Sequence, residues 1–164
     1  MYIMGKLTDV NLNKEGISTV MSNVAGKVPP IFQQLEYVRF SGDATGYLHD
    51  LIITGLLRTG AGTIKADVMM SIDKQQNRTY SGNIASADLN VGKLLDNEKK
   101  FGTADFNLEL KGFNYKNHYP ESYIKGNIAS FEYSQYKYEN IALDGVYKAV
   151  SYTHLRAHET VLDL

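Results

Sequence analysis

The sequence has no cysteine and no tryptophan among its 164 residues. Without cysteine, the chain has no disulfide, no thiolate ligand for a metal and no cysteine nucleophile, so redox chemistry is not expected. A strong net charge is missing too, because 17 basic residues nearly balance 18 acidic ones. The chain therefore lacks the positive electrostatic field that would attract nucleic acid or an anionic membrane surface, and we expect no nucleic-acid partner.

A long apolar run is also missing. No stretch approaches the roughly 20 apolar residues that cross a bilayer, and the opening MYIMGKLTDVN lacks the basic-then-apolar order of a signal peptide. Its residues alternate as they would inside a strand, without a start signal. We therefore expect the chain to be a section of a longer protein.

The last residues, AVSYTHLRAHETVLDL, contain the strongest metal-like pattern in the chain. His154 and His158 stand four residues apart beside Glu159, a spacing that suits zinc on a helix. Within this segment, however, VSYTHLRAHET resembles the translation of a transposase-type sequencing-library adaptor. We expect residues 149–164 to be a non-native tail, residues 1–148 to be the native section, and no metal site.

Alternation of apolar and polar residues dominates the chain after Leu35 and predicts successive strands. The clearest is Gly62–Ile72, where one face is apolar and the other polar. Short turns between neighbouring strands favour antiparallel pairing, because parallel crossovers need a dozen or more residues. The other predicted strands are Tyr37–Leu48, His49–Thr59, Tyr80–Ala87, Phe101–Lys111, Ser122–Phe131 and Tyr138–Tyr147.

Two segments interrupt the alternation. Residues 14–35 have apolar side chains at helical spacing, and Gly26 followed by Pro29 and Pro30 would end that helix. The second segment, Val91–Asn97, is too short for more than one helical turn. We predict that both cap an all-β fold, which is a curved, mainly antiparallel sheet with an apolar groove and one short N-terminal helix.

The five residues GNIAS occur twice, beginning at Gly82 and at Gly126, 44 residues apart. A period of this size is typical of architectures in which one supersecondary unit cannot bury its own apolar face. A general preference of strands for small residues would also produce it. We predict that both copies lie in strands of a repeated, grooved sheet.

The apolar face of the predicted strands has two alternative fates. A sandwich would bury it against a second sheet, whereas a conduit would leave it open to acyl chains, at about 0.8 kcal/mol for each methylene removed from water. The predicted lining residues of such a groove are Ile64, Val68, Met70, Ile72, Ile84, Phe106, Leu108, Leu110, Ile124 and Ile128.

Catalytic candidates are few. His49 and Asp50 are neighbours on a predicted strand and so point to opposite faces, and His118 lies in a predicted surface turn. The glycines Gly60 and Gly62 lead into a strand rather than a helix, so they predict no phosphate loop. We expect no catalytic residue, no cofactor and no enzyme. A β-helix enzyme is a third alternative, and it would require a paired-carboxylate cleft.

Three phrases in the sequence carry a family resemblance: FSGDATG at Phe40–Gly46, GLLRTGAG at Gly55–Gly62, and the segment Tyr80–Leu95 with its ending LNVGKLL. Together they resemble the TamB and AsmA-like envelope proteins of Bacteroidota, over nearly all of residues 1–148. This resemblance implies a long, curved antiparallel sheet, a β-taco, with an apolar inner surface. It also implies a periplasm-facing protein whose inner-membrane anchor is absent from this sequence.

The function implied by the resemblance is conduction of phospholipid between the inner and outer membranes, linked to outer-membrane assembly. The implied partners are phospholipid acyl chains and an outer-membrane barrel-assembly protein. The alternative is a closed β-sandwich that acts as a binding or scaffold module without lipid transport.

Overall fold

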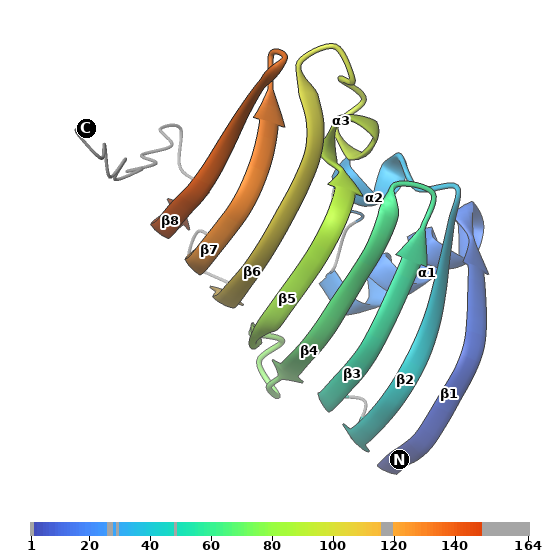
Figure 1. Cartoon of the computed structure of the whole chain (residues 1–164). Coiled ribbons are helices and arrows are strands. Elements are labelled where there is room, and N and C mark those ends of the chain that lie inside the picture. Colours follow the sequence, from blue (N-terminus) through green and yellow to red (C-terminus); the bar gives the residue numbers. More distant parts are fainter. Residues whose placement is uncertain (1, 26–27, 29, 48, 116–119, 149–164) are drawn as a thin grey trace.

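The computed structural model describes residues 2–25, 28, 30–47, 49–115 and 120–148. Within these residues, eight strands and three helices follow one another (Figure 1). They are β1 (Tyr2–Asn13), α1 (Lys14–Ala25), α2 (Pro30–Gln33), β2 (Tyr37–Tyr47), β3 (Asp50–Thr59), β4 (Gly62–Ile72), β5 (Arg78–Asn90), α3 (Val91–Leu94), β6 (Phe101–Asn114), β7 (Glu121–Tyr133) and β8 (Tyr136–Lys148).

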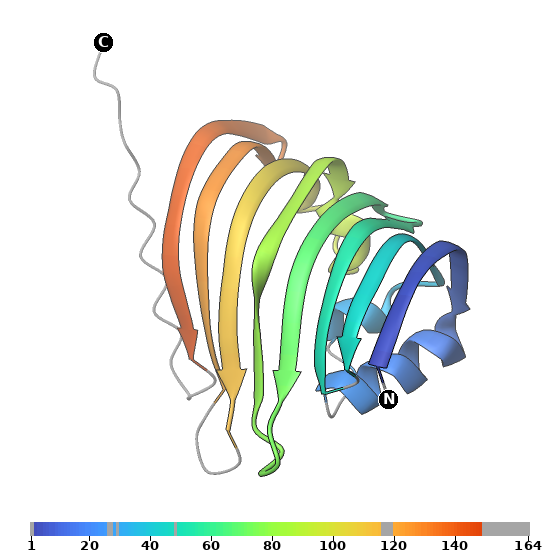
Figure 2. The same cartoon turned by 90° about the horizontal axis from the view of Figure 1, so that it is seen from below.

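All eight strands form one sheet in which each strand is antiparallel to the next, in the order β1 to β8. The strands arch along their length, so the sheet has a concave and a convex face (Figure 2). The predicted all-β, curved antiparallel fold is confirmed. The described residues form this single sheet, so the sheet that would close a sandwich is not found among them.

The strand boundaries follow the alternation closely. The predicted strand Gly62–Ile72 coincides with β4. Strand β5 is longer than predicted, since it begins at Arg78 and continues to Asn90 through an irregularity in its pairing with β6 between Ser86 and Leu89. Asp88 takes a φ of 55° there. A bulge shifts the alternation by one residue, and this shift ended the predicted strand too early.

The helices begin at side-chain caps. The Asn13 side-chain oxygen accepts a hydrogen bond from the Gly16 N–H at 2.9 Å at the start of α1. The Asn90 side-chain oxygen accepts one from the Lys93 N–H at 2.8 Å at the start of α3. Each bond satisfies a backbone donor that the first helical turn leaves free, so both helices start directly after a strand. None of the helices among the described residues is long and apolar enough to cross a bilayer.

All three helices belong to the connections β1–β2 and β5–β6, which leave the sheet at the same end of the strands. We call this the helix end, and the opposite end, which carries the β4–β5 turn of residues 73–77, the loop end. Helices α1 and α2 lie on the concave side of the sheet (Figure 2). The predicted caps are therefore found, and both cover the same end.

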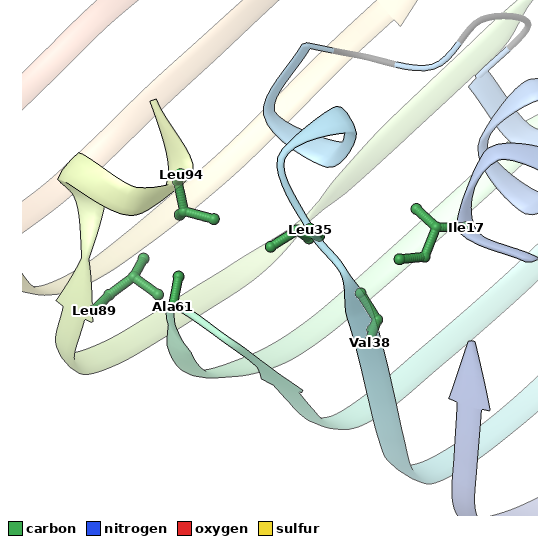
Figure 3. Packing of buried hydrophobic residues seen from close by; sticks show 6 residues of the cluster. All are labelled: Ile17, Leu35, Val38, Ala61, Leu89 and Leu94. Carbon is green, nitrogen blue, oxygen red and sulfur yellow. The ribbon is translucent and has the colours of Figure 1, made fainter. Parts of the chain in front are cut away.

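The hydrophobic core lies under these helices. Side chains from α1, α3 and the segment before β2 point toward the strand ends and the β3–β4 turn (Figure 3). Partly buried neighbours such as Leu57, Ile64 and Phe106 extend this cluster onto the sheet. Its buried members are Ile17, Leu35, Val38, Ala61, Leu89 and Leu94.

Candidate functional site

Strand pairing places every predicted lining residue on one face of the sheet. Val68 lies opposite Ile53 of β3 and Gly82 of β5, and Leu108 lies opposite Ile84 and Gly126. Directly opposed residues in an antiparallel sheet point to the same side. The core cluster under the helices belongs to the same side, so this face is the concave one.

The apolar face is wider than the sequence prediction. Strands β1, β2, β3 and β8 add further apolar side chains in the same rows. Alternation was visible in these segments, but no lining residue was assigned there. We define the concave apolar face as the predicted lining residues together with Ile3, Leu7, Val10, Phe40, Ala44, Leu51, Ile53, Leu57, Ala66, Ile141 and Leu143.

The exposure of this face separates it from an ordinary core. Each predicted lining residue, from Ile64 in β4 to Ile128 in β7, is half-buried rather than buried. Buried apolar side chains instead gather mainly at the helix end, where Ile17 is 2% exposed and Leu94 6% exposed. Within the described residues, Ala44 and Ala66 of this face are buried as well, but no second sheet covers the larger side chains in its middle.

Glycines and aromatic rings shape the concave face. The ring of Phe40 lies against Gly42 and Gly55, where any added Cβ would overlap it. Glycine on the inner side of a bent strand avoids the crowding that converging side chains would cause, and such glycines often mark bends.

The two GNIAS copies occupy equivalent positions. Gly82 in β5 has a φ of 152° and Gly126 in β7 a φ of 151°. A Cβ on Gly82 would overlap the carbonyl oxygen of Asp67, and one on Gly126 would overlap that of Asn107. Both copies of the repeat therefore meet the same backbone requirement. Each places a glycine with positive φ where the strand lies too close to its neighbour for a Cβ, once in β5 and once in β7.

Hydrogen bonds to Asp105 fasten the bulge in β5. Its carboxylate accepts bonds from the Asp88 N–H at 2.5 Å and from the Ser130 hydroxyl at 2.9 Å. These bonds favour the ionised form and hold the pKa of Asp105 below its ordinary value of 3.8. The residue therefore links β5, β6 and β7 beside the covered end.

The convex face carries a separate depression of about 510 Å³ near the loop end. Its lining comes mainly from residues that alternate onto the convex side, so it is distinct from the concave apolar face. The hydroxyl of Tyr123, one of its lining residues, donates to Glu121 at 2.6 Å, which raises the pKa of Tyr123 and lowers that of Glu121. The lining residues are Met69, Ser71, Thr79, Tyr80, Ser81, Lys111, Gly112, Phe113, Tyr115 and Tyr123.

The few catalytic candidates remain apart. The ring of His49 stacks on Tyr47 at 5.5 Å between ring centres, while Asp50 lies opposite Ser71 on the convex face. Among the described residues, no group of three histidine or carboxylate side chains could hold a metal ion. His118 and the pattern at His154, His158 and Glu159 lie outside the described residues.

Comparison of the chain with protein-family models, with curated proteins and with solved structures gives no match.

Proposed function

We propose that the concave apolar face binds the acyl chains of phospholipids and forms one section of a conduit between the inner and outer membranes. The observation that supports this most directly is a partly exposed apolar surface spread over eight strands, covered by helices at one end only. Large contiguous apolar surfaces on soluble proteins mark interaction sites, because exposing them to water is unfavourable.

The dimensions of the sheet suit such a ligand. Eight strands are separated by seven spacings of ~4.8 Å, so the face extends ~34 Å across the strands. Half of a bilayer's hydrocarbon core, the depth of one layer of acyl chains, is ~15 Å. A single acyl chain would fit within the face, and a passage across the envelope would use several sections in series.

Transport along such a surface requires no catalytic residue. Each methylene that leaves water gains about 0.8 kcal/mol, and neighbouring positions on a uniformly apolar face are nearly equivalent. A lipid would therefore be retained and still be able to slide. The resemblance to TamB and AsmA-like proteins adds a periplasm-facing location and an outer-membrane barrel-assembly partner to this proposal.

A charge placed on the concave apolar face tests the proposal. We expect Val68→Glu or Leu108→Glu to abolish lipid binding, because a carboxylate desolvated by acyl chains is strongly unfavourable. The fold should survive with a loss below about 2 kcal/mol, because both side chains are partly exposed. The measurement is mass spectrometry of lipids that co-purify with the chain, together with urea unfolding.

The matched control is Ile52→Glu in β3. Ile52 is 46% exposed and lies on the convex face, opposite Met69. This variant should keep the lipid content of the parent chain. Equal lipid content in all three variants would refute the proposal, and unfolding of Val68→Glu and Leu108→Glu alone would show that another protein layer covers the face.

A further inference from the structure

Arg78 occupies an unusual place on the concave face. As the first residue of β5, it lies opposite Ile72 of β4 and Asn114 of β6, two residues before Tyr80 in the same alternation. Among the paired strand residues of the described chain, the other charged side chains alternate onto the convex face. Arg78 is thus a single cation on an otherwise uncharged surface, at its loop end.

The guanidinium of Arg78 is not fully satisfied by the protein. Its Nε is buried without a hydrogen-bond partner, and no ion pair to Arg78 is present among the described residues. A buried donor on a cation that lacks a partner costs free energy, and such groups in native proteins call for an explanation such as a ligand.

The nearest carboxylate in the sequence is already committed. Asp73 accepts hydrogen bonds from the backbone N–H groups of Gln75 and Asn77 and from the Asn77 side chain, at 2.8 to 2.9 Å. These bonds lower the pKa of Asp73. Its charge therefore holds the β4–β5 turn together instead of neutralising Arg78.

Hydroxyl groups lie in the next row of the same face. The Tyr80 ring passes over Gly112, and its hydroxyl hydrogen-bonds to the Ser122 Oγ at 2.5 Å. Tyr147 of β8 lies opposite Ser122. The concave face is therefore graded along the strands, from the apolar cluster at the helix end to a cation and hydroxyls at the loop end.

We propose that Arg78 binds the phosphate of a phospholipid head group at the loop end, while the acyl chains of that lipid lie on the concave apolar face. The inference rests on the proposed function and adds to it the group that orients the lipid. A planar guanidinium donates parallel hydrogen bonds to phosphate oxygens, and no carboxylate of the described residues forms an ion pair with Arg78.

The test compares two lipids with the same acyl chains, bound to the 164-residue chain. A fluorescent fatty acid is bound and then displaced either by dioleoyl phosphatidylglycerol or by dioleoylglycerol, which lacks the phosphate. Arg78→Gln should weaken displacement by the phospholipid at least about tenfold, as expected for loss of a hydrogen bond to a charged group. Displacement by dioleoylglycerol should not change.

Arg58→Gln is the matched control. Arg58 is an exposed arginine on the convex face, opposite Arg39 and Thr63, and its loss should alter neither lipid. Equal effects of Arg58→Gln and Arg78→Gln would overturn the inference, because net charge would then explain both. An unchanged phospholipid affinity in Arg78→Gln would also overturn it while leaving the proposed function intact.

Two further measurements separate the remaining explanations. Arg78→Met should melt at the same temperature as the parent or higher, because it removes a cation whose buried Nε has no hydrogen-bond partner. A marked fall in melting temperature would assign Arg78 a structural role instead. Millimolar inorganic phosphate should not displace the fluorescent fatty acid. If the parent chain binds inorganic phosphate through Arg78 but binds neither lipid, the proposed function fails and a site for free phosphate remains.

Discussion

The two ends of the concave face have the same strand pattern but different surroundings. At the helix end, Ile17, Leu35, Val38 and Leu94 belong to one core cluster whose buried members are below a tenth exposed. Toward the loop end, side chains of the same apolar kind in β4 to β7 stay partly exposed. Alternation therefore determines which residues share a face, whereas the connections between strands determine which part of that face is covered.

The chain order explains why only one end is covered. Connections from odd-numbered to even-numbered strands all leave the sheet at the helix end, and two of them contain helices. At the loop end, the β4–β5 connection is a tight turn held by Asp73, with Asp73 donating its N–H to the Asn77 carbonyl oxygen. A turn of this size has no apolar surface with which to fold back over the sheet.

Ile17→Glu should have the largest effect on stability, because it places a carboxylate in the most buried position of the covered end. We expect a loss of more than about 3 kcal/mol in the free energy of unfolding, measured by urea denaturation. Val20→Glu on the same helix is the control, since Val20 is 37% exposed and should change the free energy by about 0.5 kcal/mol or less. If both variants unfold at the same urea concentration, packing under α1 does not hold this end together.

Gly126→Ala should have an intermediate effect on the free energy of unfolding. It tests whether the uncovered part of the sheet depends on the backbone conformation of its strands. The added methyl group would overlap the Asn107 carbonyl oxygen at a φ of 151°, so we expect a loss of about 1 to 3 kcal/mol. Gly145→Ala in β8 is the matched control, because nothing lies within 4 Å of its Cβ position. Urea unfolding of both variants measures the difference. If the two variants are equally stable, the glycine of the GNIAS repeat is not required by the backbone.

Much of the fold could be predicted from the sequence because alternation is a local signal. It located the strands, and helical spacing in residues 14–35 located α1. The end of β5 was misjudged because the bulge at Asp88 changes the phase of the alternation, and Asp105, which fastens it, is distant in sequence. Long-range contacts of this kind leave no periodic trace.

The candidate site was predicted only in part, for a related reason. Shared orientation of the lining residues follows from alternation, but their exposure depends on where helices from other segments pack. Arg78 was assigned to no strand, because its side-chain direction becomes clear only from its partners Ile72 and Asn114. Lipid binding itself stays a prediction.

Asp105→Asn should have the smallest effect, and that effect should depend on pH. The pKa of Asp105 in the folded chain lies below its ordinary value of 3.8. The stabilisation that its ionised carboxylate provides is therefore complete above pH 3.8 and is lost as the pH falls through the lowered pKa. The amide of the variant cannot ionise, so the urea midpoints of parent and variant should differ at pH 7 and converge in acid.

Asp144→Asn is the control, since Asp144 and its partner Lys125 are 75% and 71% exposed and 3.7 Å apart, an ion pair that contributes little. A difference for Asp105→Asn that persists unchanged in acid would show that the bulge beside the covered end is held by side-chain shape and not by the charge of its carboxylate.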